Sequence, residues 1–81
     1  MTKKVDKSPL DFESYAKYEI PHEYMAFTIQ FFDVSQMECD DLEYDYYRQG
    51  FKIFHTEIER SSGGLFNYKM IIAKSAMTFQ K

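Results

Sequence analysis

The sequence has one cysteine, Cys39, in 81 residues. A single cysteine excludes a disulfide within the chain and favours a reducing compartment, so we expect a cytoplasmic protein. No stretch approaches the roughly 20 consecutive apolar residues that a membrane-spanning helix needs. The N-terminal MTKKVDKSP carries lysines with no apolar segment behind them. We therefore expect neither a secretory signal nor an association with a membrane.

Motifs for catalysis and for cofactor binding are also missing. No spacing of histidine, cysteine and carboxylate residues matches a metal site, so we expect no metal and no other cofactor. The segment SSGG at residues 61–64 lacks the lysine and the following helix of a phosphate-binding loop, and it is interpreted as a turn. His55 and Glu57 share one face of a predicted strand and could share a proton, but a structural histidine is the favoured interpretation. We therefore expect that the protein is not an enzyme.

The sequence is rich in acidic residues in its middle and in aromatic residues throughout. The net charge is −3, yet residues 11–47 hold ten acidic residues and one lysine, whereas residues 48–81 hold six basic and two acidic residues. This asymmetry bears on the choice of partner rather than on the fold. Eight phenylalanines and seven tyrosines exceed what a small core needs, so we expect some rings at the surface or in an interface.

The N-terminal part of the chain predicts a short helix over residues 8–20. Ser8 is the expected N-cap, and Pro9 suits the first helical position. Pro21 should end the helix, because the residue before a proline is driven out of the α region. A weak apolar stripe is formed by Leu10, Tyr15 and Tyr18.

Three strands and a longer helix follow. Residues 24–32 alternate between Met25, Phe27, Ile29 and Phe31, which should face the core, and more polar side chains. Residues 51–60 and 65–74 predict a β-hairpin around two glycines, and the third strand is the most apolar. Residues 35–49 predict a helix.

This order of elements predicts an α+β fold, in which a short N-terminal helix precedes a β-α-β-β unit. The sheet should have three strands in the order 1-3-2, mixed or antiparallel, with the long helix on one face through a right-handed crossover. We expect one domain over residues 1–81, with residues 1–8 as a flexible tail and residues 76–81 as a frayed C-terminus.

The stretch SQMECDDLEYDYYRQG, residues 35–50, carries five carboxylates and three tyrosines. Ser35 and Glu38 form a predicted capping box, and Gly50 fits the position after the helix end. The core stripe should consist of Cys39, Leu42 and Tyr46. Negative charge beside the thiol should raise its pKa, so an inert buried thiol is expected rather than a nucleophile.

A second stripe with acidic flanks lies on nearly the opposite side of this helix. It consists of Met37, Asp40, Asp41, Tyr44, Asp45 and Tyr47. Three interpretations stay open: packing against the N-terminal helix, an idle solvated surface, or a recognition surface. As a recognition surface it would bind a basic protein, and its spaced carboxylates, with that of Glu43, would imitate the phosphates of a nucleic acid. The leading hypothesis is a non-enzymatic interaction module that inhibits a nucleic-acid-handling protein.

The outer face of the predicted sheet offers the main alternative, a structural homodimer. Its expected contact residues are Tyr24, Phe54, Ile58 and Ile71. This face is half apolar, so either the N-terminal helix or a second subunit should cover it. Direct nucleic-acid binding through rings and lysines of the same face is disfavoured by the anionic balance.

The run YRQGFKIFHTEIERSSGGLFNYKMIIAK, preceded by a strand and a helix, resembles small uncharacterised bacterial and phage domains of βαββ type. The resemblance spans residues 24–74 and is carried by Gly50, Phe51, Gly63 and Gly64. Those domains usually have tryptophan where this chain has Phe51. The resemblance implies the fold and no established activity, and a phage or mobile-element accessory protein would suit the chain's size.

Overall fold

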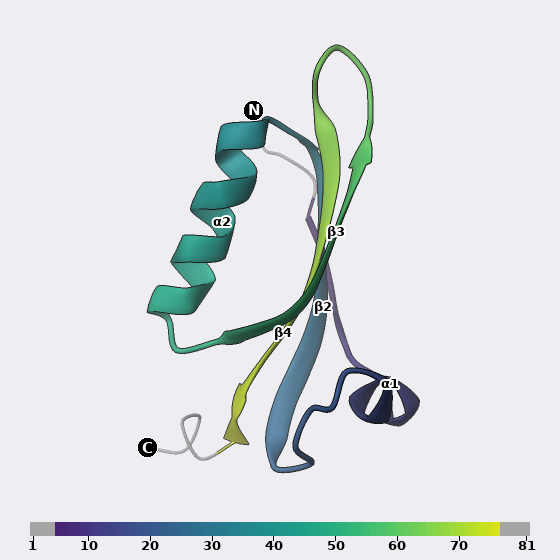
Figure 1. Cartoon of the computed structure of the whole chain (residues 1–81), viewed down its shortest axis with the longest axis vertical. Coiled ribbons are helices and arrows are strands. Elements are labelled where there is room, and N and C mark those ends of the chain that lie inside the picture. Colours follow the sequence, from purple (N-terminus) through teal and green to yellow (C-terminus); the bar gives the residue numbers. More distant parts are fainter. Residues whose placement is uncertain (1–4, 77–81) are drawn as a thin grey trace.

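Apolar alternation and good turn signals produce an α+β fold, in which one antiparallel sheet has a helix on each side (Figure 1). The computed structural model describes residues 5–76. The elements are β1 (Val5–Pro9), α1 (Phe12–Lys17), β2 (Tyr24–Val34), α2 (Gln36–Arg48), β3 (Lys52–Arg60) and β4 (Phe66–Ser75). The strand order is β1-β2-β4-β3. The side of the sheet that α2 covers is called the α2 face here, and the opposite side is called the outer face.

Within residues 5–76 the sheet has four strands, so the prediction of three was wrong. The order β2-β4-β3 corresponds to the predicted order 1-3-2, and β1 adds an edge strand that pairs with β2 from Val5 opposite Phe31 to Pro9 opposite Phe27. Part of the predicted flexible tail is therefore a strand, while residues 1–4 lie outside the described residues. A long β2 presents backbone groups along its edge, and β1 satisfies them; a proline is tolerated in such an edge strand.

This pairing also moves the start of the first helix. Ser8 and Pro9 belong to β1, and the Leu10 amide continues the ladder by donating to the Ala26 carbonyl at 3.0 Å. Helix α1 begins only at Phe12, after Asp11 as N-cap. The prediction of Ser8 as N-cap was wrong, because its backbone is committed to the sheet.

Both ends of α2 confirm the prediction. Ser35 and Glu38 form a reciprocal capping box. At the other end Gly50 has a φ of 96°, and two hydrogen bonds close the helix, from the Gly50 amide to the Tyr47 carbonyl and from the Phe51 amide to the Tyr46 carbonyl. The rings of Tyr46 and Phe51 pack 5.8 Å apart. This is a Schellman motif with its usual apolar contact, and it turns the chain from α2 into β3.

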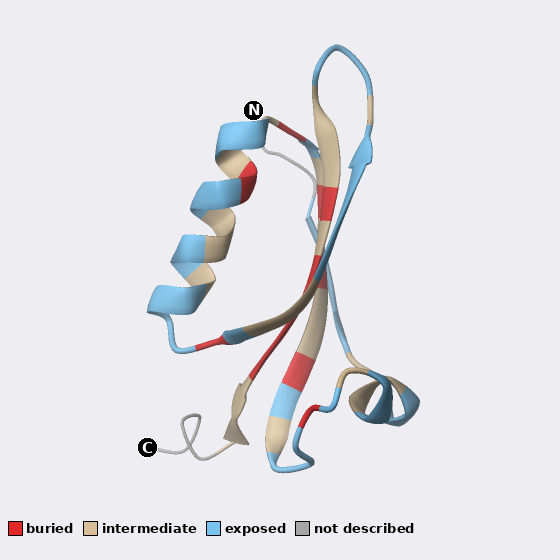
Figure 2. Cartoon of the chain, in the orientation of Figure 1, coloured by how far each residue is buried: buried red, intermediate tan, exposed pale blue. Residues whose placement is uncertain are grey.

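Two apolar clusters of the described residues lie on opposite faces of the sheet. Figure 2 shows buried residues on the strands, on α2 and in the segment between α1 and β2. On the α2 face the predicted core stripe of Cys39, Leu42 and Tyr46 packs against the sheet, which confirms it. The buried sheet residues there are Ile29, Phe31, Val34, Tyr68, Met70 and Ile72. The central position of β4 explains why it is the most apolar strand. It ends at Ser75, and residues 77–81 of the predicted frayed end lie outside the described residues.

The second cluster forms where the α1 segment covers one end of the outer face. Its buried members are Ile20, Ala26, Ile71 and Ala73. The predicted stripe of Leu10, Tyr15 and Tyr18 packs against them. The Tyr15 hydroxyl also donates to the Tyr24 carbonyl at 3.0 Å and accepts from the Ala26 amide at 3.1 Å. The N-terminal helix therefore covers the outer face of the sheet and not α2.

A β-bulge in β3 changes which side chains share a face. Ile53 pairs with Ile72 and His55 with Ile71, so Phe54 is an extra residue. Beyond the bulge Ile58 lies opposite Tyr68 and therefore on the α2 face, whereas the sequence placed it on the outer face. His55 moves to the outer face, where its ring lies 5.0 Å from that of Tyr18.

Candidate functional site

The exposed side of α2 carries all six predicted partner-binding residues, namely Met37, Asp40, Asp41, Tyr44, Asp45 and Tyr47. The three apolar or aromatic members are open to solvent, with exposed fractions of 74% for Met37, 61% for Tyr44 and 70% for Tyr47. Because α1 lies across the sheet, it does not cover them. The interpretation that this stripe is internal packing was therefore wrong, and a solvated or a recognition surface remains.

A shallow groove of about 350 Å³ runs between α2 and β3. Its lining residues are Asp40, Glu43, Tyr44, Tyr47 and Ile53. The four helical members are three and four positions apart, so they form one continuous patch on the helix surface. The groove thus combines two carboxylates and two phenols with an apolar residue of the sheet.

Only some of the six predicted partner-binding residues line the groove. Asp40, Tyr44 and Tyr47 line it, whereas Met37, Asp41 and Asp45 do not, although they lie on the same helix. Ile53 of β3 completes the lining, and it is not one of the predicted partner-binding residues. The missing signal was the approach of β3 to the helix, which helical periodicity alone does not contain.

Glu43 ties the wall of the groove to the core. Its carboxylate accepts a hydrogen bond from the hydroxyl of Tyr68, a residue that is buried in β4. Burial, followed by this bond to a carboxylate, raises the pKa of the Tyr68 phenol well above its ordinary value. The tyrosine therefore stays a neutral donor, and Glu43 is held in a fixed position beside Asp40.

Tyr44 already contacts a cation within the chain. The Arg48 guanidinium lies 5.7 Å from the centre of the Tyr44 ring, at a spacing of four residues along the helix. Aromatic rings attract cations through their negative faces, and carboxylates nearby strengthen the attraction. The geometry around the groove is therefore suited to the ammonium or guanidinium group of another protein.

The four predicted oligomer residues do not form one exposed face. Ile71 is buried, and Tyr24 and Phe54 pack against the cluster under α1. Ile58 is 48% exposed but lies on the other side of the sheet. The α1 segment has taken the place that a second subunit would have filled.

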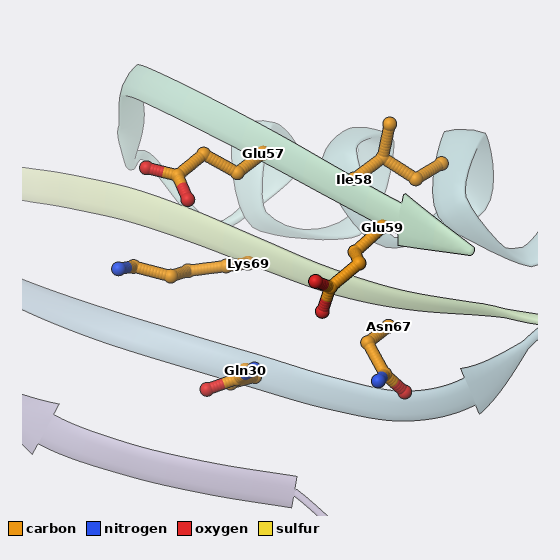
Figure 3. A pocket seen from close by; sticks show the side chains of 6 residues that line it. All are labelled: Gln30, Glu57, Ile58, Glu59, Asn67 and Lys69. Atoms are coloured by element: carbon orange, nitrogen blue, oxygen red, sulfur yellow. The ribbon is translucent and has the colours of Figure 1, made fainter. Parts of the chain in front are cut away.

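The uncovered end of the outer face is polar. A hollow of about 430 Å³ there is lined by Gln30, Glu57, Ile58, Glu59, Asn67 and Lys69 (Figure 3). His55 and Glu57, the predicted proton-sharing pair, contact each other at 3.0 Å through Nε2 and Oε2 at the surface. Cys39 cannot act as a nucleophile beside this pair, because it is buried on the opposite side of the sheet.

Two further observations concern residues 5–76. No group of three or more histidine, cysteine or carboxylate residues in this range is arranged to hold a metal ion. No helix in this range has the length and apolar character needed to cross a membrane.

No protein-family model, curated protein or solved structure matches the chain. The resemblance to bacterial and phage βαββ domains therefore stays a prediction.

Proposed function

We propose that the protein is a non-enzymatic interaction module that binds the basic surface of a nucleic-acid-handling protein and inhibits it. The supporting observation is the groove in which Asp40 and Glu43 lie beside Tyr44 and Tyr47. Carboxylates attract basic side chains, and tyrosines add contact area and a cation-binding ring with little loss of side-chain entropy. A partner that evolved to neutralise phosphates presents this kind of basic surface.

The distribution of charge favours the same partner. Asp41 and Asp45 extend the negative charge of the groove over the exposed side of α2, and Met37 adds an apolar contact. Such a surface steers a basic protein toward the helix and repels nucleic acid. Cytoplasmic location and an origin in a phage or mobile element are part of the proposal, and they agree with the lone buried thiol and with the small size of the chain.

The experiment compares the wild type with a variant in which Asp40, Asp41 and Asp45 are all replaced by asparagine. Each immobilised protein is used to capture proteins from a bacterial lysate, and the bound proteins are eluted with salt or with DNA. The wild type should retain a basic nucleic-acid-binding protein that salt and DNA release, because both compete for its cationic groups. The triple variant should lose it while its circular dichroism is unchanged. Equal retention by both proteins would contradict the proposal.

The homodimer keeps no specific support from the geometry, because α1 covers the apolar end of the outer face. Light scattering at high protein concentration tests it directly. A monomer is expected.

A further inference from the structure

The strand β3 forms one edge of the sheet. In the described part of the chain it pairs only with β4, and its nine residues contain no proline. The other edge strand, β1, has five residues and ends in Pro9. An unpaired edge presents alternating amide and carbonyl groups that can accept a further strand. The edge of β3 is therefore the better of the two for strand addition.

The bulge at Phe54 gives the second half of this edge two different sides. Glu57 and Glu59 lie on the outer face, opposite Lys69 and Asn67 of β4. Figure 3 shows both carboxylates on this face and Ile58 pointing away from them. Glu57 has a partner in His55, whereas no hydrogen bond or ion pair of the Glu59 side chain is found among residues 5–76. One side of the edge is thus acidic.

The other side of β3 carries Ile53 and Ile58, with Thr56 between them and Arg60 at the end, and it leads to the groove. Ile58 is 48% exposed and lies opposite Tyr68 on the α2 face. Ile53, further back along the same strand, lines the groove with Tyr44 and Tyr47. A strand added beside β3 would place alternate side chains over Glu57 and Glu59 and the intervening side chains beside Ile58 and toward the groove.

We propose that β3 accepts an extended segment of the basic partner as a fifth strand, in which basic residues alternate with apolar ones. The basic side chains would lie over Glu57 and Glu59, and the apolar side chains would lie against Ile58 and the groove. This inference rests on the proposed function, since it names the part of the basic partner that binds. It adds main-chain hydrogen bonds to a surface that otherwise offers charge and rings.

A second copy of this chain is a poorer occupant of the same edge. In an antiparallel pair with two-fold symmetry centred on Ile58, Glu57 of each copy would lie opposite Glu59 of the other. Like charges directly opposite each other destabilise a pair of strands. The acids thus disfavour self-pairing and favour a basic strand, which has the complementary charge.

The first test uses a blocked peptide, Lys-Ile-Lys-Val-Lys-Ile, and a second peptide of the same composition in the order Lys-Lys-Lys-Ile-Val-Ile. The two carry equal charge, so simple electrostatic attraction would bind them equally. Isothermal calorimetry with the whole protein should show that the alternating peptide binds about tenfold more tightly. Equal affinities of the two peptides would contradict the proposed alternation of basic and apolar residues in the bound strand.

The second test places N-methyl groups on every other residue of the alternating peptide, in two versions that differ in phase. Alternate residues of an added strand direct their amides toward β3, and the others direct them away. One version should therefore lose about tenfold or more in affinity, while the other binds like the parent peptide. Equal affinities of the two versions would overturn strand addition. Failure of all peptides to bind would also overturn it.

Two variants separate this inference from the proposed function. Glu59→Lys should abolish binding of the alternating peptide, whereas Glu23→Lys, with the same change of charge in the turn before β2, should not. If the two N-methylated versions bind equally and the triple asparagine variant of α2 does not bind the peptide, strand addition is overturned. The acidic helix would then be the surface that binds the peptide. Phase-sensitive binding that this variant keeps would support strand addition, because the basic side chains of the peptide lie over Glu57 and Glu59 and not over α2. The helix is then tested separately, by whether the same variant still captures the basic partner.

Discussion

The Tyr68 hydroxyl donates a hydrogen bond to the Glu43 carboxylate and so joins β4 to the exposed helix α2 across the core. One partner is buried in the centre of the sheet, and the other forms a wall of the groove. This contact makes the shape of the candidate site depend on the packing of the core.

Replacing Tyr68 with phenylalanine should lower the free energy of unfolding by about 1–3 kcal/mol. The substitution leaves a partly buried carboxylate without its donor, and such a loss costs about this much. Chemical denaturation at neutral pH measures the effect. Tyr44→Phe is the matched control, because that ring is 61% exposed and should change stability by no more than about 0.5 kcal/mol. Equal effects of the two substitutions would contradict a structural role for the contact.

Alkaline pH should destabilise the protein in part through the same tyrosine. The pKa of Tyr68 is raised in the folded state by burial and by its bond to Glu43, whereas the unfolded chain has an ordinary phenol pKa of about 10. The folded state therefore holds the proton more tightly, so this contribution is complete below about pH 10 and is lost as the pH rises above it. Chemical denaturation at pH 8 and at pH 10.5 gives the free energy of unfolding at each pH. Between the two pH values Tyr68→Phe should lose less of this free energy than the wild type.

Cys39 should react slowly with thiol reagents while the protein is folded. Its side chain is buried, and burial, followed by the charges of Asp40, Glu43 and Glu38, raises the pKa of the thiol. The thiolate is the reactive form, so both access and ionisation are suppressed. Labelling with a chromogenic disulfide at pH 8 should be slow in buffer and fast in denaturant. Fast labelling of the folded protein would show that α2 does not hold this residue against the sheet.

Asp40→Asn should weaken binding of the basic partner more than Asp45→Asn. The two substitutions remove the same charge from one helix, but only Asp40 lines the groove. A carboxylate that contacts a bound cation contributes a charge-assisted hydrogen bond, whereas a more distant one acts through screened attraction. Affinity measurements at about 0.15 M salt, where this screening is strong, should separate the two variants. Equal losses would mean that the helix acts only through its total charge.

Phe54→Lys should destabilise the folded chain, whereas Ile58→Lys should change its stability little. Phe54 packs in the cluster under α1, and the centres of its ring and the Tyr24 ring lie 6.4 Å apart. A lysine charge at this position would be costly to bury and would disrupt the contact between α1 and the sheet. We expect a loss of roughly 2 kcal/mol or more for Phe54→Lys. Thermal unfolding at several protein concentrations checks this. A melting temperature that rises with concentration would instead favour the dimer.

The helix α2 was predictable because its signals are local. The capping box at Ser35 and the glycine at position 50 act within a few residues of the backbone they stabilise. The core stripe of Cys39, Leu42 and Tyr46 packs against distant strands, but its helical spacing is visible within the segment itself. The charge of the helix follows from its composition, whereas the exposure of its second stripe was decided only by the position of α1 on the outer face. The central position of β4 was predictable from its apolar character.

The errors lie where distant segments decide the outcome. Ser8 and Pro9 make a reasonable helix start by themselves, but the open edge of β2 offers them hydrogen bonds along a strand. The bulge at Phe54 depends on how β3 fits against β4, and it moves Ile58 and His55 to faces that simple alternation does not predict.

By itself the sequence determined a small α+β protein with an acidic, tyrosine-rich helix, because periodicity, capping and charge are properties of short segments. Only the tertiary structure decided that α1 covers the outer face, that a groove lies between α2 and β3, and that Glu57 and Glu59 lie on one side of β3 with Ile53 and Ile58 on the other. These features depend on strand register and on which face each helix covers, and both are decided by contacts between residues that are far apart in the chain.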